Sequence, residues 1–307
     1  MFTGLLSCGT QVVTELQTAA HDLAGEWRMH ACKTLDDLAN TAYSRLSASK
    51  DAPLCWRRLY TDTSVLRTLG DLEDAVDQTL AKVCIARLDR AIITAGPCGE
   101  GRLELVLDLI REIQSEYLNE SPRPYFLYSR SRPVFPAPQS PTSVPRLPDP
   151  PSFTSFISTH SLTPFVISRY ATDWPATKAW HNVQYLRTVA GPGRVVPVEV
   201  GGDYRAQDWT QRIMEWDAFV DTLRTPSTDE ILYLAQHNLF KQFPKLREDV
   251  MIPDYVYASL PAPQDFPEYT PPGNDDQLVE NIWLGPVGTV SPAHTVRTIN
   301  HIHLPLR

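Results

Sequence analysis

RVVPVEVGG, residues 194–202, is the stretch that decides the fold class. Valines recur along it and two glycines follow, a pattern that favours a strand running into a turn. Residues 279–284 favour a second strand, residues 285–288 a turn, and residues 289–291 the start of another strand. Because short strands are mixed with few helices, this region predicts an α+β architecture, or a β-barrel with helical additions.

The segments around these strands are less regular. Residues 207–222 predict a helix with Ile213 and Trp216 on its apolar face, and residues 230–240 fit a helix or a strand equally well. A further helical stretch is expected near 174–190. The C-terminal region therefore combines a sheet with flanking helices.

The first 120 residues have the apolar spacing of helices. The candidate helices are 11–29, 33–48, 55–68, 71–95 and 101–119. The last of them also carries acidic residues at every fourth position, namely Glu104, Asp108, Glu112, Glu116 and Glu120. Such a row predicts a solvated outer face, with a surface for a basic partner as the alternative. Thr61, Asp62 and Thr63 are candidate helix caps, and Gly70 is a candidate helix stop.

Proline separates this helical region from the rest of the chain. Of the 27 prolines, 10 lie between residues 122 and 151, where they exclude helices and a central strand. We therefore expect a helical domain over 1–120, an extended Pro-rich linker over 121–152 and a second domain over 153–307. No apolar run approaches the ~18 residues of a membrane span.

Charge and cysteine content exclude further classes. The net charge is −8, and residues 1–120 hold 12 basic and 18 acidic groups, so the chain lacks the dense basic face of a duplex-binding domain. The odd number of cysteines, without a CxxC pair, argues against a disulfide framework or a zinc ribbon. Reduced thiols in an intracellular protein are the expected state.

Familiar catalytic motifs do not occur in the chain. There is no Gly-rich phosphate loop, no GxSxG and no HExxH. His160, His181 and His237 are isolated from one another in sequence, and each is interpreted as a structural or surface histidine. The end of the chain differs, because His294, His301 and His303 lie close together there.

A series of stretches in this chain resembles the JmjC-domain family, in the subgroup of lysine demethylases and peptidyl-arginine hydroxylases. The stretches are VPRLPDPPSFTSF (144–156), DWPATKAW (173–180), YLRTVAGPGRVVPVEVGGDY (185–204), YLAQHNLFKQFPKLREDVMIPDY (233–255) and NIWLGPVGTVSPAH (281–294). CWRRLYTDTSVLRTLGDL (55–72) also resembles the helical N-terminal domain of that subgroup. The resemblance implies a cupin-like double-stranded β-helix, or jelly roll.

The resemblance also implies a site that holds Fe(II) and the cosubstrate 2-oxoglutarate. His294 matches the first iron histidine of the family, and Tyr204 and Ser291 match residues that hydrogen-bond 2-oxoglutarate. Trp283 matches an aromatic residue of the substrate pocket, and Asn300 falls, by count, on a further 2-oxoglutarate ligand. For Tyr204 and Trp283, packing in the core is the alternative interpretation.

The iron site departs from the family pattern directly after His294. The family places an aspartate two residues later, where this chain has Val296, whose side chain cannot bind a metal. The chain ends 13 residues after His294, so the second iron histidine has no counterpart. His301 and His303 are possible substitutes, and unrelated tail residues are the alternative. We therefore expect a C-terminally truncated domain that binds neither iron nor 2-oxoglutarate, with the missing half encoded downstream.

Three functions are compatible with these observations. The first is an oxygenase that hydroxylates or demethylates proteins, with a protein or histone tail as substrate and residence in the nucleus or cytoplasm, all implied by the resemblance. The second is a non-catalytic helical scaffold or protein-interaction module. The third is an incomplete record of the enzyme. None of them calls for direct binding to nucleic acid or to a membrane.

Overall fold

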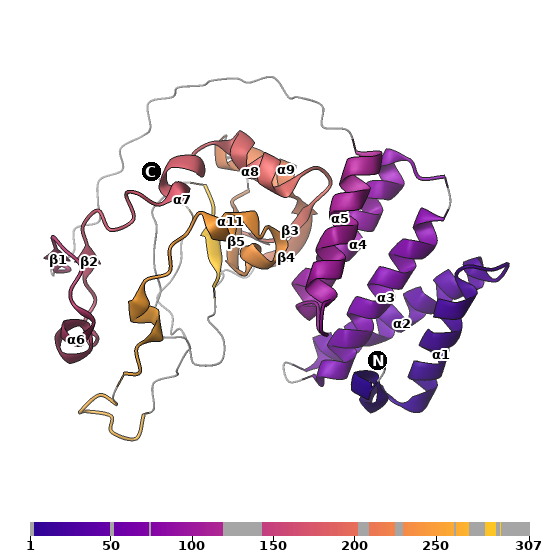
Figure 1. The fold of residues 1–307 in the computed structure, drawn as a ribbon, viewed down its shortest axis with the longest axis horizontal. Helices are drawn as coiled ribbons and strands as arrows, with labels where there is room; N and C mark the ends of the chain where they lie inside the picture. The colour runs from indigo at the N-terminus through magenta and orange to yellow at the C-terminus, as the bar shows by residue number, and fades with distance from the viewer. Residues whose placement is uncertain are drawn as a thin grey trace. The chain divides into compact units, whose positions relative to one another are not determined.

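The structure, a computed structural model, describes residues 3–49, 52–73, 75–118, 143–201, 209–224, 230–260, 262–269, 280–286 and 289 (Figure 1). The chain divides into two compact units. The first comprises Met1–Glu120, Val183–Pro244 and Asn281–Pro292, and the second Ser121–Asn182, Lys245–Glu280 and Ala293–Arg307. A helical N-terminal region is followed by an antiparallel sheet, which confirms the predicted α+β class.

Five helices, α1 to α5, form the N-terminal region as predicted, although the first ends before residue 29 and the fourth begins after residue 71. Their bounds are α1 Thr10–Asp22, α2 Arg28–Ala48, α3 Leu54–Leu72, α4 Gln78–Ala95 and α5 Arg102–Tyr117, and a short 3₁₀ helix, η1, covers Thr3–Cys8. One apolar cluster, which includes Leu35 and Leu59, joins α1, α2 and α3. A second cluster, which includes Val65 and Ile110, joins α3, α4 and α5. Because α3 contributes to both clusters, it is the central helix of this region.

The predicted stop at Gly70 is wrong, because Gly70 lies inside α3. A Cβ there would come within 2.8 Å of the Cys32 Sγ on α2, so the glycine permits close helix packing rather than ending the helix. The predicted caps Thr61, Asp62 and Thr63 are also wrong, since all three are buried in the middle of α3. The hydroxyls of Thr61 and Thr63 donate to backbone carbonyls four residues earlier, which satisfies them inside the helix.

The ends of α4 follow ordinary capping chemistry. The Asp77 carboxylate accepts a hydrogen bond of 2.7 Å from the Leu80 N–H, which satisfies a free donor of the first turn. Gly96 ends the helix in the left-handed region at φ 65°, where glycine has no steric penalty. Both ends of α4 are therefore fixed by capping interactions. Among the described residues, this helix carries the most deeply buried charged side chain.

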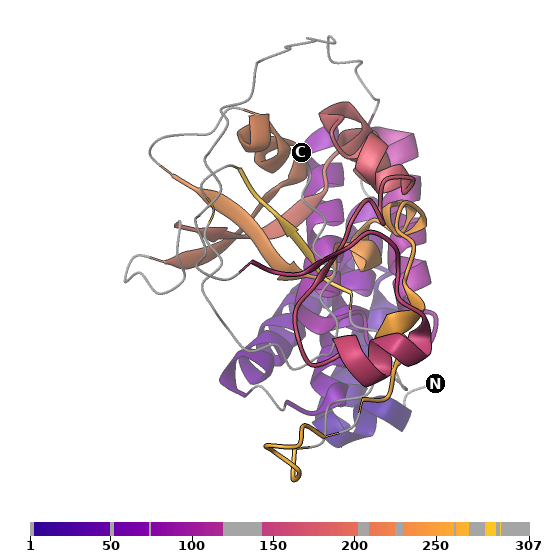
Figure 2. The same ribbon diagram turned by 90° about the vertical axis from the view of Figure 1, so that its left-hand side faces the viewer.

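The larger sheet has the antiparallel strand order β4-β3-β5-β6 within the described part of the chain (Figure 2). The strands are β3 Val195–Val200, β4 Thr210–Glu215, β5 Leu232–His237 and β6 Ile282–Leu284. β3 pairs with β4 along its whole length and with β5 through Glu199 opposite Tyr233. The strand predicted at 194–200 is confirmed, and the strand predicted at 279–284 is present as β6 from Ile282 to Leu284. The strand predicted from residue 289 lies outside the described residues except for Thr289.

The single helix predicted over residues 207–222 is wrong in its first half. Residues 210–215 form β4, and the helix, α9, covers only Trp216–Arg224. Pairing along β3 overrides the helical spacing, so Ile213 lies on a strand. Trp216 is buried, and its Nε1–H donates to the Leu186 carbonyl of α8 (Val183–Ala190) at 3.1 Å.

The ambiguous segment 230–240 contains strand β5 and the start of a short helix, α10, at Leu239–Gln242. Phe243, directly after α10, is buried, and its ring centroid lies 5.1 Å from that of Trp216. This stretch therefore adds a strand to the sheet, and Phe243 adds an aromatic contact to Trp216 at the start of α9.

The second unit consists of short elements. They are β1 Arg146–Leu147, α6 Phe153–Ser155, a π-helical turn at Phe156–His160, β2 Val166–Ile167, α7 Pro175–Ala179, α11 Lys245–Glu248 and a 3₁₀ turn at Asp254–Tyr257. β1 and β2 pair in parallel. Contacts between distant residues hold this unit together: the Phe156 and Tyr255 rings lie 4.8 Å apart, and the Trp180 Nε1–H donates to Asp249 at 2.8 Å.

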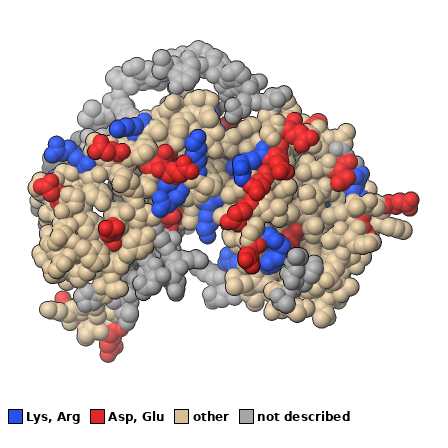
Figure 3. Space-filling view, in the orientation of Figure 1, with Lys and Arg blue, Asp and Glu red and all other residues tan. Residues whose placement is uncertain are grey.

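The acidic row of α5 is solvent-exposed. Glu104, Asp108, Glu112 and Glu116 are exposed, and Figure 3 shows a row of acidic side chains over this helix. The residues on the opposite face, including Ile110 and Ile113, are buried. Across the described ranges, no helix combines the length and apolarity that crossing a membrane requires.

Helix α5 offers a test of this core. Ile110 is 1% exposed and Leu105, on the same helix, is 39% exposed. We expect Ile110→Ala to lower the free energy of unfolding by about 2–5 kcal/mol, because it leaves a cavity in the second apolar cluster. Leu105→Ala should cost less than about 1 kcal/mol. Urea denaturation of both variants measures the difference, and equal losses would contradict this packing.

Candidate functional site

Trp283 lies on the half-buried face of the larger sheet. Leu234 and Leu284 pair across β5 and β6, so their neighbours Tyr233 and Trp283 point to the other face. Glu199 pairs with Tyr233 from β3 and shares that face. The Trp209 Nε1–H donates to the Glu199 carboxylate at 3.4 Å. The half-buried face thus combines one carboxylate with three aromatic side chains, a mixture typical of ligand sites.

A tight turn follows β6. A Cβ on Gly285 would lie 2.7 Å from the Tyr233 ring and 2.6 Å from the Thr289 Cγ2, so no larger residue fits without displacement. The Thr289 hydroxyl donates to the Pro286 carbonyl at 3.1 Å.

The other predicted site residues lie outside the described residues. These are Tyr204, Ser291, His294 and Asn300, together with Val296 and the possible substitutes His301 and His303. Their roles therefore remain predictions, and only Trp283 is placed, on β6 with its side chain half-buried.

A buried polar network joins α4 to the start of the sheet. The Asp89 carboxylate on α4 accepts from Arg194 Nε at 2.9 Å and from a terminal nitrogen of the same guanidinium at 2.7 Å. It also accepts from the Val195 N–H at 2.9 Å and from Gln242 Nε2 at 2.7 Å. Asp89 is 0% exposed and Arg194 5% exposed, so neither charge is screened by water.

Neighbouring groups complete this network. The Arg194 guanidinium donates to the Gln242 carbonyl at 2.9 Å and lies 4.6 Å above the Phe243 ring. His237 Nε2 donates to Gln242 Oε1 at 2.6 Å. Burial lowers the pKa of His237, since the charged imidazolium is poorly solvated there, although the hydrogen bond to Gln242 and the charge of Asp89 act in the opposite direction.

A second contact holds the loop that leads into β3. Gln114 of α5 donates to the Ala190 and Pro192 carbonyls at 3.1 and 2.8 Å. Gly193, at φ 79°, follows against the Ile85 side chain, which a Cβ would approach to 3.2 Å. The polar contacts of Asp89 and Gln114 thus fix where the sheet begins relative to the helices within the first unit.

Comparison with known proteins identifies the domain. Residues 152–298 match the family model described as a cupin-like domain. The chain is 31% identical to lysine-specific demethylase 8 of Danio rerio over 258 residues, and 32% identical to Jumonji C domain-containing protein 5 of Drosophila melanogaster over 251 residues. It is 40% identical to lysine-specific demethylase JMJ30 of Arabidopsis thaliana over 134 residues. Residues 152–298 thus match a cupin-like domain, and the relatives that the chain resembles include Jumonji C proteins.

The extent of these matches differs between the JmjC relatives. The alignment with the Danio rerio protein covers 80% of this chain and 59% of that protein, and the Drosophila melanogaster alignment covers 79% and 57%. The Arabidopsis thaliana alignment covers 43% and 28%. The chain therefore spans less than two thirds of these relatives, and the two longer alignments extend beyond the cupin-like domain into the first 151 residues.

The sequence of this chain departs from the iron-site pattern that the family resemblance predicts. Within the described ranges, no group of three His, Cys, Asp or Glu side chains is arranged to hold a metal ion. Two of the histidines interpreted from the sequence as structural or surface residues make other contacts. His237 is hydrogen-bonded to Gln242, and the centroid of the His160 ring lies 5.3 Å from that of Phe165. The sequence resemblance predicts a ligating carboxylate where this chain has Val296, whose side chain offers no donor atom. No chemistry through bound iron is therefore derived from this chain.

Sequence reasoning missed the Asp89 network, although one signal was available. Asp89 lies between Ile85, Leu88 and Ile92, on the apolar side of a helix where a charge is not expected. A charge in that position indicates a buried partner. Arg194 opens the predicted strand but gives no sign of which carboxylate it contacts.

The network predicts a large effect from a small substitution. Asp89→Asn leaves the Arg194 guanidinium buried without a counter-charge, so we expect a loss of about 3–5 kcal/mol in the free energy of unfolding. The matched control is Asp108→Asn, which removes an exposed pair with Arg111 and should cost about 1 kcal/mol or less. Chemical denaturation compares the two variants, and a similar small loss in both would show that the buried pair is not important for stability.

His237 predicts a pH dependence of stability. Because its pKa is lowered in the folded state, the unfolded chain takes up the proton first as the pH falls below about 6.5. Stability is thus complete above that pH and is lost as the pH falls toward the lower folded pKa. We expect His237→Gln to flatten the change in unfolding free energy between pH 7.5 and 5, whereas His21→Gln, at an exposed position, should not. Equal slopes in all three proteins would contradict this.

Proposed function

We propose that this chain derives from the Fe(II)- and 2-oxoglutarate-dependent oxygenases that hydroxylate or demethylate proteins, and that these 307 residues alone do not form the catalytic centre. The observation that carries the proposal is the match of residues 152–298 to the cupin-like domain, combined with Val296 in place of the ligating carboxylate. The match to the family supports the class of reaction. Val296 is the reason for expecting that this chain does not bind the iron.

Other residues support the family assignment of the site. Tyr204 and Ser291 carry hydroxyls that would hydrogen-bond 2-oxoglutarate, and Asn300 offers an amide for the same purpose. Trp283, on the half-buried face with Tyr233, would form the apolar wall against a substrate side chain. When bound, the iron and cosubstrate would supply the oxidising power, and these side chains would only bind and orient.

The names of the relatives support a proposal for the substrate. Two of them are named as lysine-specific demethylases, so a lysine-bearing protein such as a histone tail is the proposed substrate, and the nucleus is the proposed location. Arginine hydroxylation is the second possibility within the same family resemblance. Neither choice alters the prediction for this chain, because both reactions need the same three iron ligands.

A non-catalytic role is the alternative. Its support is the ordered helical region, whose two apolar clusters consist entirely of residues from the first 118 positions. In that case residues 1–118 would serve as a protein-interaction module and the cupin-like part as its structural support.

Turnover distinguishes these possibilities. The chain is incubated with Fe(II), 2-oxoglutarate and histone or ribosomal-protein peptides, and succinate release is measured. We expect no succinate above the level of a His294→Ala control, because one imidazole cannot replace the facial triad. Val296→Asp alone is also expected to be inactive, since the second histidine has no matched position in this chain. Succinate release that His294→Ala abolishes would overturn the proposal, and its loss in His301→Ala or His303→Ala would identify a substitute ligand.

A further inference from the structure

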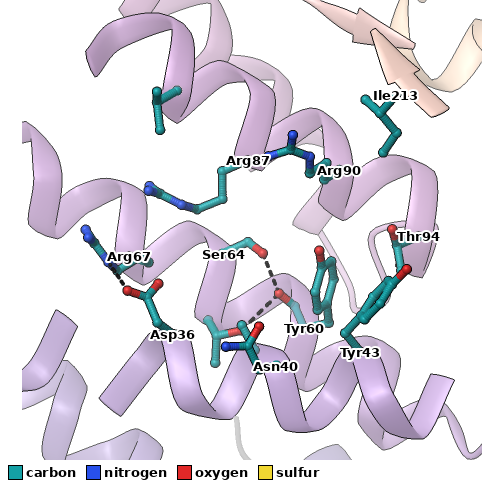
Figure 4. A pocket seen from close by; sticks show the side chains of 13 residues that line it. Asp36, Asn40, Tyr43, Tyr60, Ser64, Arg67, Arg87, Arg90, Thr94 and Ile213 are labelled. Carbon is teal, nitrogen blue, oxygen red and sulfur yellow. Dashed lines mark hydrogen bonds and ion pairs between the residues drawn. The ribbon is translucent and has the colours of Figure 1, made fainter. Parts of the chain in front are cut away.

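A cleft of about 650 Å³ opens in the helical region of the first unit (Figure 4). Its lining comes from α2, α3 and α4, with Ile213 of β4 at the edge. Clefts of this size accommodate a side chain together with its neighbours in a peptide. None of the described residues that line it belongs to the predicted iron site.

Two of the α3 residues that line the cleft are small and polar. Thr63 and Ser64 are buried there, and their hydroxyls donate to the backbone carbonyls of Leu59 and Tyr60, at 2.8 Å from Thr63 and 2.7 Å from Ser64. Both hydroxyl hydrogens are already donated to carbonyl groups of α3, so these side chains have no free donor to offer a ligand. Because the side chains are small, they also leave space above the helix.

Guanidinium groups dominate the charge of the cleft. Arg67 pairs with Asp36 at 3.1 Å and with Asp71, and Arg87 pairs with Asp71 at 2.8 Å. Arg90 is exposed, and no carboxylate of the described residues lies within ion-pair distance of it. Three guanidinium groups thus share two carboxylates, which leaves one positive charge in excess.

This excess is local, because the surrounding domain is acidic. Residues 1–120 hold 12 basic and 18 acidic groups, and the acidic row of α5 is exposed on the same domain. A long polyanion such as a nucleic acid would meet repulsion over most of this surface. A short segment with one or two negative charges would meet only the excess charge of the cleft.

Aromatic rings lie across the cleft from Arg87 and Arg90 (Figure 4). Tyr43 and Tyr60 have ring centroids 6.2 Å apart, and Tyr43 is 51% exposed. Burial raises the pKa of Tyr60, so its hydroxyl stays neutral. An exposed ring across a cleft from guanidinium groups suits a ligand that carries an apolar group beside its charge.

We propose that this cleft binds an acidic peptide segment of a partner protein. Its oxyanion, the carboxylate of Asp or Glu or the phosphate of a phosphorylated residue, is held by Arg90 with Arg87. The neighbouring apolar side chain of the segment packs on Tyr43. Arg90 is the residue that decides affinity, because it alone of the three arginines has no carboxylate partner in the described part of the chain.

Peptide arrays test this with the full chain. The arrays carry degenerate octapeptides with a fixed central Glu, phosphoserine or Gln, and the strongest peptides are measured by fluorescence anisotropy. We expect binding to the Glu or phosphoserine series over the Gln series, weakening with salt. Arg90→Glu should reduce affinity by about tenfold or more, because it removes a charge-assisted hydrogen bond.

The matched control is Lys33→Glu, which makes the same change of charge on exposed α2 outside the cleft and should leave affinity nearly unchanged. Thermal denaturation confirms that both variants fold. Preference for Glu or for phosphoserine identifies the source of the oxyanion. Equal signals from all three series, equal effects of the two variants, or tighter Arg90-dependent binding of an oligothymidylate than of any peptide would each overturn the proposal.

Discussion

The carboxylate of Asp89 is buried on α4 and receives the guanidinium of Arg194 at the point where the chain enters the sheet. Taking two charges out of water is costly, and a pair of this kind is tolerated only when its geometry is good and its remaining donors and acceptors are satisfied. Here the Val195 N–H and Gln242 complete the coordination of the carboxylate. Any arrangement in which α4 and β3 separated would expose or strand these groups, so the pair fixes one geometry.

The rest of the sheet depends on that fixed starting point. β3 is held at its first residue and pairs on both sides, with β4 over its full length and with β5 through Glu199. β5 in turn holds β6, and β6 carries Trp283 on the face that also holds Tyr233. The position of the candidate substrate face is thus set by a chain of strand pairings that begins at Arg194, far from residue 294 in the sequence.

Local patterns predicted those elements that depend on local chemistry. The apolar spacing around Ile110 and the valines of 194–200 were sufficient for a helix and a strand. Gly70 and Ile213 were misinterpreted because their surroundings are set by partners distant in sequence: α2 packs closely against Gly70, and β3 pairs with the strand of Ile213. The partners of Asp89 could not be predicted for the same reason, since Arg194 and Gln242 are each more than one hundred residues away from it in the sequence.

The candidate site is inferred mostly from the sequence and only in small part from the structure. Trp283 was placed from motif resemblance, and the structure puts it on a strand of the sheet, whereas His294 and Val296 are known only as residues in the sequence. The family was predicted from runs of residues such as 233–255, and the match over 152–298 agrees with it. The prediction that the iron ligand is missing rests on the identity of residue 296 alone, because a valine side chain cannot bind a metal ion in any conformation.

Native-state hydrogen exchange tests most directly whether the Asp89 pair makes α4 and the sheet one cooperative unit. We predict that amides of α4 and of β3, including the Val195 amide that donates to Asp89, exchange with the same opening free energy and respond equally to denaturant. Exchange of β3 through an opening of much lower free energy, while α4 stays protected, would show that the sheet separates from the helices and would contradict this central role of the pair.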